Sequence, residues 1–212
     1  MSKLDLVTEK FASVPYMDLA QARVLADIIE REQAEQILEI GFYHGKSSCY
    51  IGAILEDRGA GTLTTVDRES ARERSPNIEG MLSACGLTDR VQALYCYRSY
   101  TWELQKLITS EAPPQFDLCY FDGGHMWDGT GFGLILVDML LKPGGLLILD
   151  DMDWTIDQSP FFQQNPNLAQ EYSADERAAP TVRLAWDLIL PRLGYVHEAE
   201  IRELHWGVAR KT

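Results

Sequence analysis

The chain has 212 residues, a length that can close one hydrophobic core without dividing into separate domains. Hydrophobic residues make up 46% of it, and no apolar run approaches the roughly 20 residues that cross a bilayer, so a membrane-spanning protein is not expected. The 19 Lys and Arg against 32 Asp and Glu give a net charge of −13, which disfavours nucleic acid and anionic lipid and favours a small neutral or cationic partner.

The N-terminal residues carry neither a continuous apolar segment nor a cleavage site, so we expect a cytoplasmic protein made of one domain over residues 1–212. The four cysteines are scattered singly, with none of the paired spacings that bind zinc, and are predicted to be buried free thiols: Cys49, Cys85, Cys96 and Cys119. The sequence leaves the oligomeric state open, and a homo-oligomer is compatible with it.

Helical and strand-like segments alternate along the chain. Residues 17–32 place apolar side chains on one helical stripe, and five short apolar segments then follow, separated by helical stretches or glycine-rich turns: 36–40, 62–67, 91–96, 116–122 and 145–150. Their apolarity is continuous rather than alternating, as in parallel strands that are buried on both faces. The order predicts an α/β fold with a doubly wound sheet.

The pattern changes after Asp151. Residues 153–180 contain prolines, Asn/Gln-rich turns and scattered aromatics with little periodicity, and are predicted to form loops or short helices as a lid over a ligand pocket. A helix is predicted from 181 to 190, and two alternating segments, 193–201 and 203–211, predict an antiparallel hairpin. The expected fold is a mostly parallel seven-stranded sheet with a C-terminal hairpin.

Ligands of such sheets bind beyond the carboxyl ends of the strands. The first strand is followed by a turn containing Gly41 and Gly45, which would let a ligand approach the backbone, and by Ser47 or Ser48 as a predicted helix N-cap. The dinucleotide fingerprint G-x-G-x-x-G is missing, which disfavours NAD. Asp67 ends the second strand, where a carboxylate commonly accepts hydrogen bonds from two ribose hydroxyls; a helix cap is the alternative.

The successive segments ILEIGFYHGKSS, TLTTVD, FDLCYFDGGH and LLKPGGLLILDD resemble the motifs of class I S-adenosylmethionine (SAM)-dependent methyltransferases, with a Rossmann-like fold. The resemblance implies that the glycine turn lies against the methionine part of SAM, that Glu39 supports this turn and that Asp67 binds the ribose. It also implies that the segment 96–99 flanks the adenine. The cofactor-binding residues expected on this basis are Glu39, Gly41, Gly45, Ser47, Asp67, Arg68, Tyr97 and Asp122.

The pair FDGGH and ILDDMDW is similar to metal-dependent O-methyltransferases acting on sugar hydroxyls of natural products, and to a cephalosporin-hydroxylase-type group. The resemblance implies that Asp122, Asp150 and Asp151 hold Mg²⁺, or Mn²⁺. Three such carboxylates would repel one another unless one were protonated or a cation lay among them, and a site made of oxygen ligands suits a hard cation. Asp150 as a turn cap, with Asp122 facing water, is the alternative.

A metal-bound hydroxyl loses its proton more easily, and the resemblance implies that His125 takes that proton as a catalytic base. His44 is a weaker candidate, His197 and His205 are predicted to be structural, and the aromatic residues Trp127, Trp154, Phe161 and Phe162 fit either a pocket wall or a core. The expected function is transfer of methyl groups to a hydroxyl of a small molecule such as a sugar or a glycosylated natural product. Two alternatives stay open: a cofactor-binding module without activity, and an NAD-dependent oxidoreductase.

Overall fold

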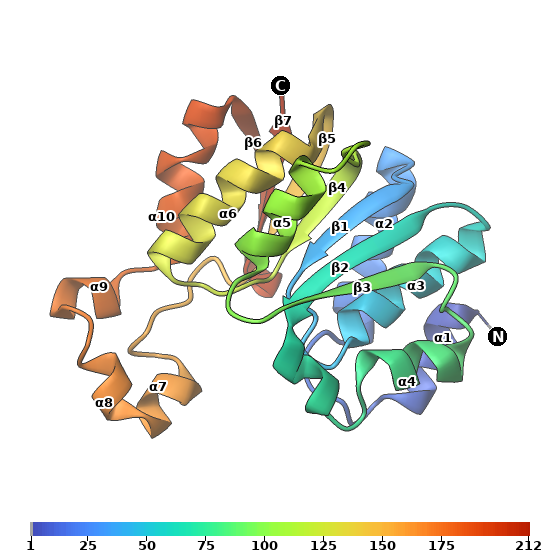
Figure 1. Cartoon of the computed structure of the whole chain (residues 1–212), viewed down its shortest axis with the longest axis horizontal. Coiled ribbons are helices and arrows are strands. Elements are labelled where there is room, and N and C mark those ends of the chain that lie inside the picture. Colours follow the sequence, from blue (N-terminus) through green and yellow to red (C-terminus); the bar gives the residue numbers. More distant parts are fainter. Residues whose placement is uncertain (1) are drawn as a thin grey trace.

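The computed structural model describes residues 2–212 and shows a seven-stranded sheet in the order β3-β2-β1-β4-β5-β7-β6 (Figure 1). All neighbours pair in parallel except β7, which is antiparallel to both β5 and β6. The α/β class, the seven strands and the C-terminal hairpin are therefore confirmed. The strands are β1 (Gln36–Ile40), β2 (Thr62–Arg68), β3 (Val91–Cys96), β4 (Phe116–Phe121), β5 (Leu141–Leu149), β6 (Tyr195–Ile201) and β7 (Trp206–Lys211).

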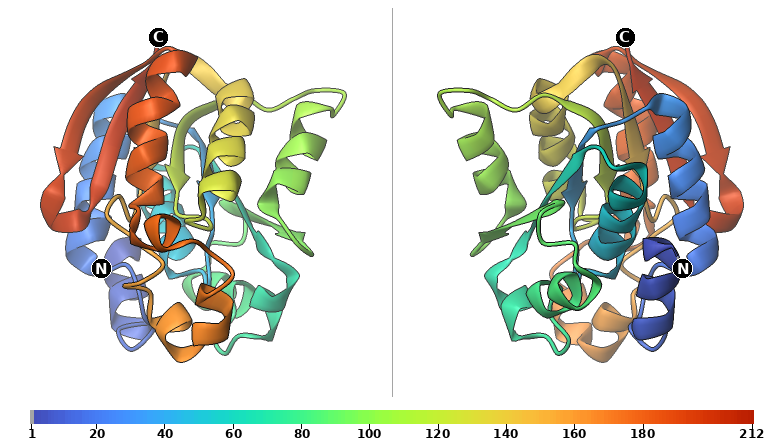
Figure 2. Two further views of the ribbon diagram at one scale, coloured as in Figure 1. Left: turned by 90° about the vertical axis from the view of Figure 1, so that its left-hand side faces the viewer. Right: turned by 90° about the vertical axis from the view of Figure 1, so that its right-hand side faces the viewer.

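Helices cover both faces of the sheet (Figures 1 and 2). One face carries α1 (Lys3–Lys10), α2 (Leu19–Glu32), α3 (Lys46–Arg58) and α4 (Ile78–Cys85), and the other carries α5 (Tyr100–Ile108), α6 (Trp127–Leu140) and α10 (Thr181–Leu188). In the left view of Figure 2, α10, α6 and α5 stand side by side. Short 3₁₀ turns are η1 (Glu69–Glu73), η2 (Leu190–Leu193) and η3 (Arg202–Leu204).

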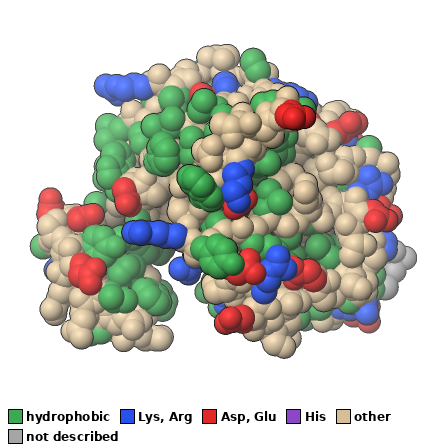
Figure 3. Space-filling model, in the orientation of Figure 1, with side chains coloured by type: hydrophobic (Ala, Val, Ile, Leu, Met, Phe, Trp, Pro, Cys, Tyr) green, Lys and Arg blue, Asp and Glu red, His purple; other side chains and the backbone are tan. Residues whose placement is uncertain are grey.

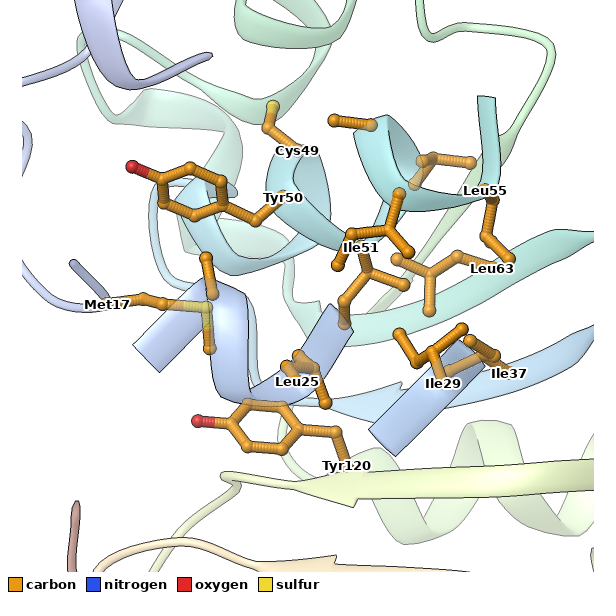
Figure 4. Packing of buried hydrophobic residues seen from close by; sticks show 14 of the residues in the cluster. Met17, Leu25, Ile29, Ile37, Cys49, Tyr50, Ile51, Leu55, Leu63 and Tyr120 are labelled. Atoms are coloured by element: carbon orange, nitrogen blue, oxygen red, sulfur yellow. The ribbon is translucent and has the colours of Figure 1, made fainter. Parts of the chain in front are cut away.

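Two hydrophobic clusters fill the space between the sheet and its two helical layers. Ile37 of β1 faces the α2 and α3 layer, and the next residue, Leu38, faces the α5 and α6 layer, because successive strand side chains point to opposite faces. In Figure 4, Tyr120 of β4 lies beside Leu25 of α2. The central strands are thus apolar on both sides, which explains their continuous apolarity in the sequence. All four cysteines are buried and free, as predicted.

Residues 153–180 leave the sheet and form the short helices α7 (Pro160–Gln164), α8 (Pro166–Ala169) and α9 (Ala174–Ala178). We call the part formed by residues 159–178 the lobe. It stands apart from the body at the lower left of Figures 1 and 3, and its helices contain no buried residue. The predicted short-helix character of this segment is confirmed, and its helices lie beyond the carboxyl ends of the strands (Figure 1).

Two local predictions need correction. Helix α3 begins at Lys46 with Gly45 as its N-cap, so neither Ser47 nor Ser48 caps it; both lie inside its first turn. The connection between β6 and β7 spans residues 202–205, longer than the near-contiguous hairpin that the sequence predicted, because η3 and a left-handed His205 turn the chain. Among residues 2–212, no helix has the length and apolarity required to cross a membrane.

Candidate active site

The turn between β1 and α3 presents bare backbone at the carboxyl edge of the sheet. Gly41 and Gly45 have φ of 86° and 101°, values that favour glycine. A Cβ at Gly41 would collide with the backbone carbonyl of Asp122, and one at Gly45 would lie 2.5 Å from the side chain of Ile78. The amide of Gly41 also donates to the carbonyl of Val66 at 2.8 Å. The turn is therefore held between the ends of β2 and β4, and no larger residue fits.

Glu39 is fully buried beneath this turn. Its Oε2 accepts hydrogen bonds from the hydroxyls of Ser48 and Thr65, the latter at 2.6 Å. Burial raises the pKa of Glu39 to about 7, although the serine and threonine hydroxyls oppose that rise. Its Oε1 has no hydrogen-bond partner among residues 2–212. The carboxyl group thus links β1, β2 and α3 immediately behind the glycine turn.

Asp67 at the end of β2 also contacts the glycine turn. Its Oδ2 accepts from the amides of Phe42 and Tyr43 at 2.9 and 2.6 Å, and its Oδ1 accepts from the amide of Arg68 at 2.6 Å. Three amide donors give this carboxylate charge-assisted hydrogen bonds to the backbone around it. The structure thus places Asp67 beside the turn, as a ribose acceptor requires, and also shows it holding the turn in shape.

The ends of β4 and β5 bring together Asp122, His125 and Asp151. One ligand atom from each of these residues lies within 4.8 Å of the other two, and His125 Nε2 is 3.1 Å from Asp151 Oδ2. Burial and the nearby carboxylates of Asp150 and Asp151 raise the pKa of Asp122 well above its usual range. Burial lowers the pKa of His125, against the opposing effect of Asp151. Asp151 has a φ of 55°, unusual for a residue with a side chain.

Asp150 is oriented differently from its neighbours. Its Oδ2 accepts from the hydroxyl of Tyr120, and its Oδ1 accepts from the amide of Asp151 at 2.7 Å. Burial raises the pKa of Asp150 to about 6, and the Tyr120 hydroxyl opposes that rise. The structure thus groups His125, rather than Asp150, with Asp122 and Asp151, which differs from the predicted trio of carboxylates. Asp150 instead caps the turn after β5.

A family model described as a methyltransferase domain matches residues 38–152, a little over half of the chain and the part that contains all of these residues. The chain belongs to this methyltransferase-domain family. The expected class I methyltransferase is confirmed, and the oxidoreductase alternative is set aside. A comparison with curated proteins finds no match.

Solved methyltransferase structures share the fold over nearly the whole chain. An O-methyltransferase from Bacillus cereus, in complex with SAH, is 18% identical with a TM-score of 0.68, covering 99% of this chain and 90% of that one. The O-methyltransferase TomG from Streptomyces achromogenes, involved in tomaymycin synthesis and solved with SAM, is 18% identical with a TM-score of 0.65, covering 100% and 90%. A SAH-bound methyltransferase from Podospora anserina is 15% identical with a TM-score of 0.67, covering 100% and 88%.

The other residues considered from the sequence lie in α3, at the ends of β2 and β3, in the glycine turn and on β6. Ser47 is buried in the first turn of α3, Arg68 ends β2, and Tyr97 is 91% exposed just after β3. His44 binds the carbonyl of Pro76 through Nδ1 at 2.6 Å. His197 stacks on Trp186 with ring centroids 3.9 Å apart.

Aromatic side chains connect His125 of the methyltransferase to the lobe. The ring centroid of Trp154 is 5.3 Å from that of His125 and 6.3 Å from that of Phe162 in α7. Phe162 in turn contacts Phe161 and Tyr172. Of the aromatics considered from the sequence, Trp154 is thus the one beside the predicted base, whereas Trp127 is 40% exposed at the start of α6.

Sequence reasoning missed three residues that shape the methyltransferase site. Tyr120 orients Asp150, Thr65 binds Glu39, and Arg74 lies over the ring of Tyr43 with 3.4 Å between its guanidinium carbon and the ring centroid. Tyr120 and Thr65 lie inside β4 and β2, where the sequence shows only strand character. A signal was available for both, because a polar atom inside a buried strand needs a partner.

Proposed function

We propose that this methyltransferase transfers the methyl group of SAM to a hydroxyl of a small molecule, with Mg²⁺ or Mn²⁺ bound at Asp122 and Asp151 and with His125 as the base. The observation that carries the proposal is the convergence of Asp122, His125 and Asp151 within 4.8 Å. This group lies next to the glycine turn, since the backbone of Asp122 is in contact range of Gly41. A methyl donor held at the turn would therefore be close to an acceptor held at the acidic residues.

The residues fit a hard divalent cation. Two carboxylates and an imidazole face one another, and no donor among residues 2–212 binds the carboxylate of Asp122. Clustered anions without donors are stabilised by a cation, and carboxylate oxygens are preferred ligands of Mg²⁺ and Mn²⁺. Asp122 and Asp151 would be ligands, with Asp150 beside them. A bound cation supplies Lewis acidity that lowers the pKa of an acceptor hydroxyl.

His125 is suited to accept the hydroxyl proton. Its lowered pKa keeps the imidazole neutral near physiological pH, and neutral imidazole is the basic form. A hydrogen bond from Nε2–H to Asp151 would orient the ring and leave Nδ1 free to take a proton. The acceptor oxygen would then attack the methyl carbon as the carbon–sulfur bond breaks, and the electron pair would stay on sulfur.

The acceptor pocket is proposed to lie between these residues and the lid, residues 153–180. Trp154 in this segment contacts His125, so its indole would form one wall. The expected acceptor remains a hydroxyl of a sugar or a glycosylated natural product. An assay with labelled SAM and a panel of glycosides, catechols and hydroxy acids tests the proposal. SAM should also raise the melting temperature, because it binds only the folded state, whereas NAD should not.

Chelation is the sharpest test of the metal. EDTA should abolish methyl transfer and Mg²⁺ should restore it, while calorimetry finds SAM affinity nearly unchanged. Asp151→Ala should behave like the chelated enzyme. Full activity in EDTA would show that the acidic residues are structural and would refute the metal. SAM binding without methyl uptake by any acceptor of the panel would favour a cofactor-binding module.

A further inference from the structure

Helix α10 begins with a residue that is bonded to the backbone of His125. Thr181 is the first residue of α10 and is 2% exposed, and its hydroxyl donates to the main-chain carbonyl of His125. No other donor among residues 2–212 binds that carbonyl. A buried bond of this kind has no water to replace it, so its loss would leave the carbonyl unpaired. Thr181 thus fixes the backbone of His125 from a segment 56 positions further along the chain.

Arg183, two residues further along α10, is bonded to the segment that follows β5. Its Nε and Nη2 lie 2.9 and 2.8 Å from Oδ1 of Asp153. Its Nη1 lies 3.2 Å from a carboxylate oxygen of Glu200 on β6. Asp153 stands between Asp151 and Trp154 in the sequence, so Arg183 holds the segment that carries both of them.

The first turn of α10 therefore joins the two segments that build the acidic group. His125 belongs to the connection between β4 and α6, whereas Asp151 follows β5, and their side chains meet at 3.1 Å between Nε2 and Oδ2. Helix α10 is itself held in place, because it lies beside α6 (Figure 2) and buries Val182 and Trp186 in the core. A packed helix that is bonded to two site segments fixes their relative position.

The same turn also connects the lid to His125. The lid begins with Asp153 and Trp154, and the ring centroid of Trp154 is 5.3 Å from that of His125. The lid ends at residue 180, immediately before Thr181, whose hydroxyl binds the His125 carbonyl. Contacts at both ends of the lid thus converge on His125, one on its ring and one on its backbone.

We propose that the first turn of α10 is a positioning element of the site, in which Thr181 holds His125 and Arg183 holds the segment of Asp151 and Trp154. The expected effect on turnover rests on the proposed function, because the placement of His125 limits the rate only if His125 is the base. A base acts within about 2.6–3.2 Å of the proton that it takes, and a displacement of about 1 Å can cost about 10²-fold in rate. The effect on the position of His125 does not depend on that function.

Thr181→Val tests the hydroxyl, because valine has nearly the same shape and cannot donate. The variant should lower kcat by about 10- to 100-fold and leave the KM for SAM nearly unchanged. Thr181→Ser keeps a hydroxyl and should restore most of the kcat. Thr8→Val is the matched control, because the hydroxyl of Thr8 donates to the carbonyl of Leu4 at 3.0 Å within α1, and this variant should have the kcat of the parent.

NMR of the histidine rings reports the position of His125 without any methyl transfer. The ring of Trp154 is close enough to shift the signals of His125, so those signals depend on the distance between the two rings. Thr181→Val should move the His125 signals, which are assigned by their loss in His125→Ala, and should leave those of His44 in place. Thr181→Ser should return them to the parent values. A parent without methyl transfer would refute the proposed function, and these signals would still decide the positioning role.

Arg183→Met tests the second attachment and decides the matter if Thr181→Val fails to fold, which circular dichroism would reveal. It should lower kcat and move the His125 signals, because the segment after β5 loses its bond to α10. Arg90→Met is the matched control, because Arg90 pairs with Glu56 at 2.7 Å at the amino end of β3 and its side chain is 23% exposed, against 28% for Arg183.

Three results would overturn the proposal. One is a folded Thr181→Val chain, or a folded Arg183→Met chain where Thr181→Val does not fold, whose His125 signals match those of the parent. Another is a Thr181→Ser chain as impaired as Thr181→Val, because the hydroxyl would then not be what holds His125. The third is an equal movement of the His125 signals in Thr8→Val or Arg90→Met.

Discussion

The two acidic regions of the site differ in how their carboxylates are stabilised. Behind the glycine turn, Glu39 accepts from two hydroxyls and Asp67 accepts from three amides. At the ends of β4 and β5, Asp122 accepts from no donor among residues 2–212, and Asp151 has only the imidazole of His125. Amide and hydroxyl donors thus hold the carboxylates of the first region, although Oε1 of Glu39 has no partner among residues 2–212, whereas Asp122 and Asp151 of the second region face each other without such donors.

This difference indicates which region is built for shape and which for chemistry. Carboxylates that hold backbone amides fix the geometry of a binding turn before any ligand arrives. Carboxylates that face one another raise the free energy of the folded chain until a cation or a proton joins them. Substitutions in the first region should therefore alter cofactor affinity or stability, and substitutions in the second should alter turnover.

The largest expected effect is on turnover, from His125→Ala. Loss of a positioned base should lower kcat by roughly 10²- to 10⁴-fold, and the deficit should shrink as pH rises and the acceptor ionises unaided. Calorimetric titrations with Mg²⁺ and with SAM should show both affinities nearly unchanged. His197→Ala is the control, because His197 stacks on Trp186 away from the site. If His125→Ala abolishes Mg²⁺ binding, the histidine is a ligand and not the base.

Glu39→Gln should change the pH dependence of stability. The folded pKa of about 7 lies above the ordinary value of 4.5, so the stability that protonated Glu39 contributes is fully present below pH 4.5 and is lost as pH rises through 7. The difference in unfolding free energy between the variant and the parent should therefore shift by roughly 3 kcal/mol in favour of the variant between low pH and a pH above 7. Urea unfolding at both pH values measures this, with the exposed Glu35→Gln as control. A difference independent of pH would show that Glu39 is not protonated on folding in this range.

Asp67→Ala should weaken SAM binding by about 2–3 kcal/mol, or roughly 30- to 150-fold in Kd, because a charged acceptor of two ribose hydroxyls is lost. The melting temperature without ligand should also fall, since the amides of Phe42 and Tyr43 lose their acceptor. Asp57→Ala is the control, because Asp57 accepts from the amide of Lys3 far from the turn. Unchanged SAM affinity measured by calorimetry would contradict the ribose placement.

The sequence predicted the sheet better than the side-chain geometry of the site. The bounds of β1 and β3 agree with the predicted segments, because their apolar runs are enclosed by polar or turn residues. Helix α1 was not predicted, since Val7 is its only buried residue and a short helix with one buried position has little periodicity. Because parallel strands share one carboxyl edge, the residues that follow the apolar runs could be predicted to lie near one another.

The orientation of Asp150 illustrates what the sequence could not provide. Asp150 and Asp151 are adjacent, and the resemblance treats them as an equivalent pair. Their roles separate because Tyr120, 30 positions earlier on the neighbouring strand, donates to Asp150, and because the left-handed backbone at Asp151 turns that residue towards His125. Both causes are contacts between distant segments or backbone angles, which spacing along the chain does not specify.

The smallest expected effect concerns the lid. Arg177 in α9 pairs with Asp157 at 3.2 Å and donates to the carbonyl of Tyr172 at 3.0 Å, so it ties α9, which has no buried residue, to the segment that precedes α7. Because this pair is partly exposed, Arg177→Ala should cost only about 0.2–1 kcal/mol of global stability. Limited proteolysis should nevertheless cut residues 153–180 faster in the variant, because local opening requires less free energy than unfolding.

The acidic region and the lid should also be coupled. SAM and an acceptor together should slow cleavage of residues 153–180 in the parent, because a closed lid excludes water from the transfer. Arg72→Ala is the control, since Arg72 pairs with Glu69 at 2.8 Å outside the lid, and it should leave cleavage within 153–180 unchanged. If the parent is cut elsewhere first and residues 153–180 resist the protease without ligand, this segment is a fixed wall of the pocket. Trp154 would then be held against His125 by a rigid segment, and acceptor binding should leave the proteolysis pattern the same.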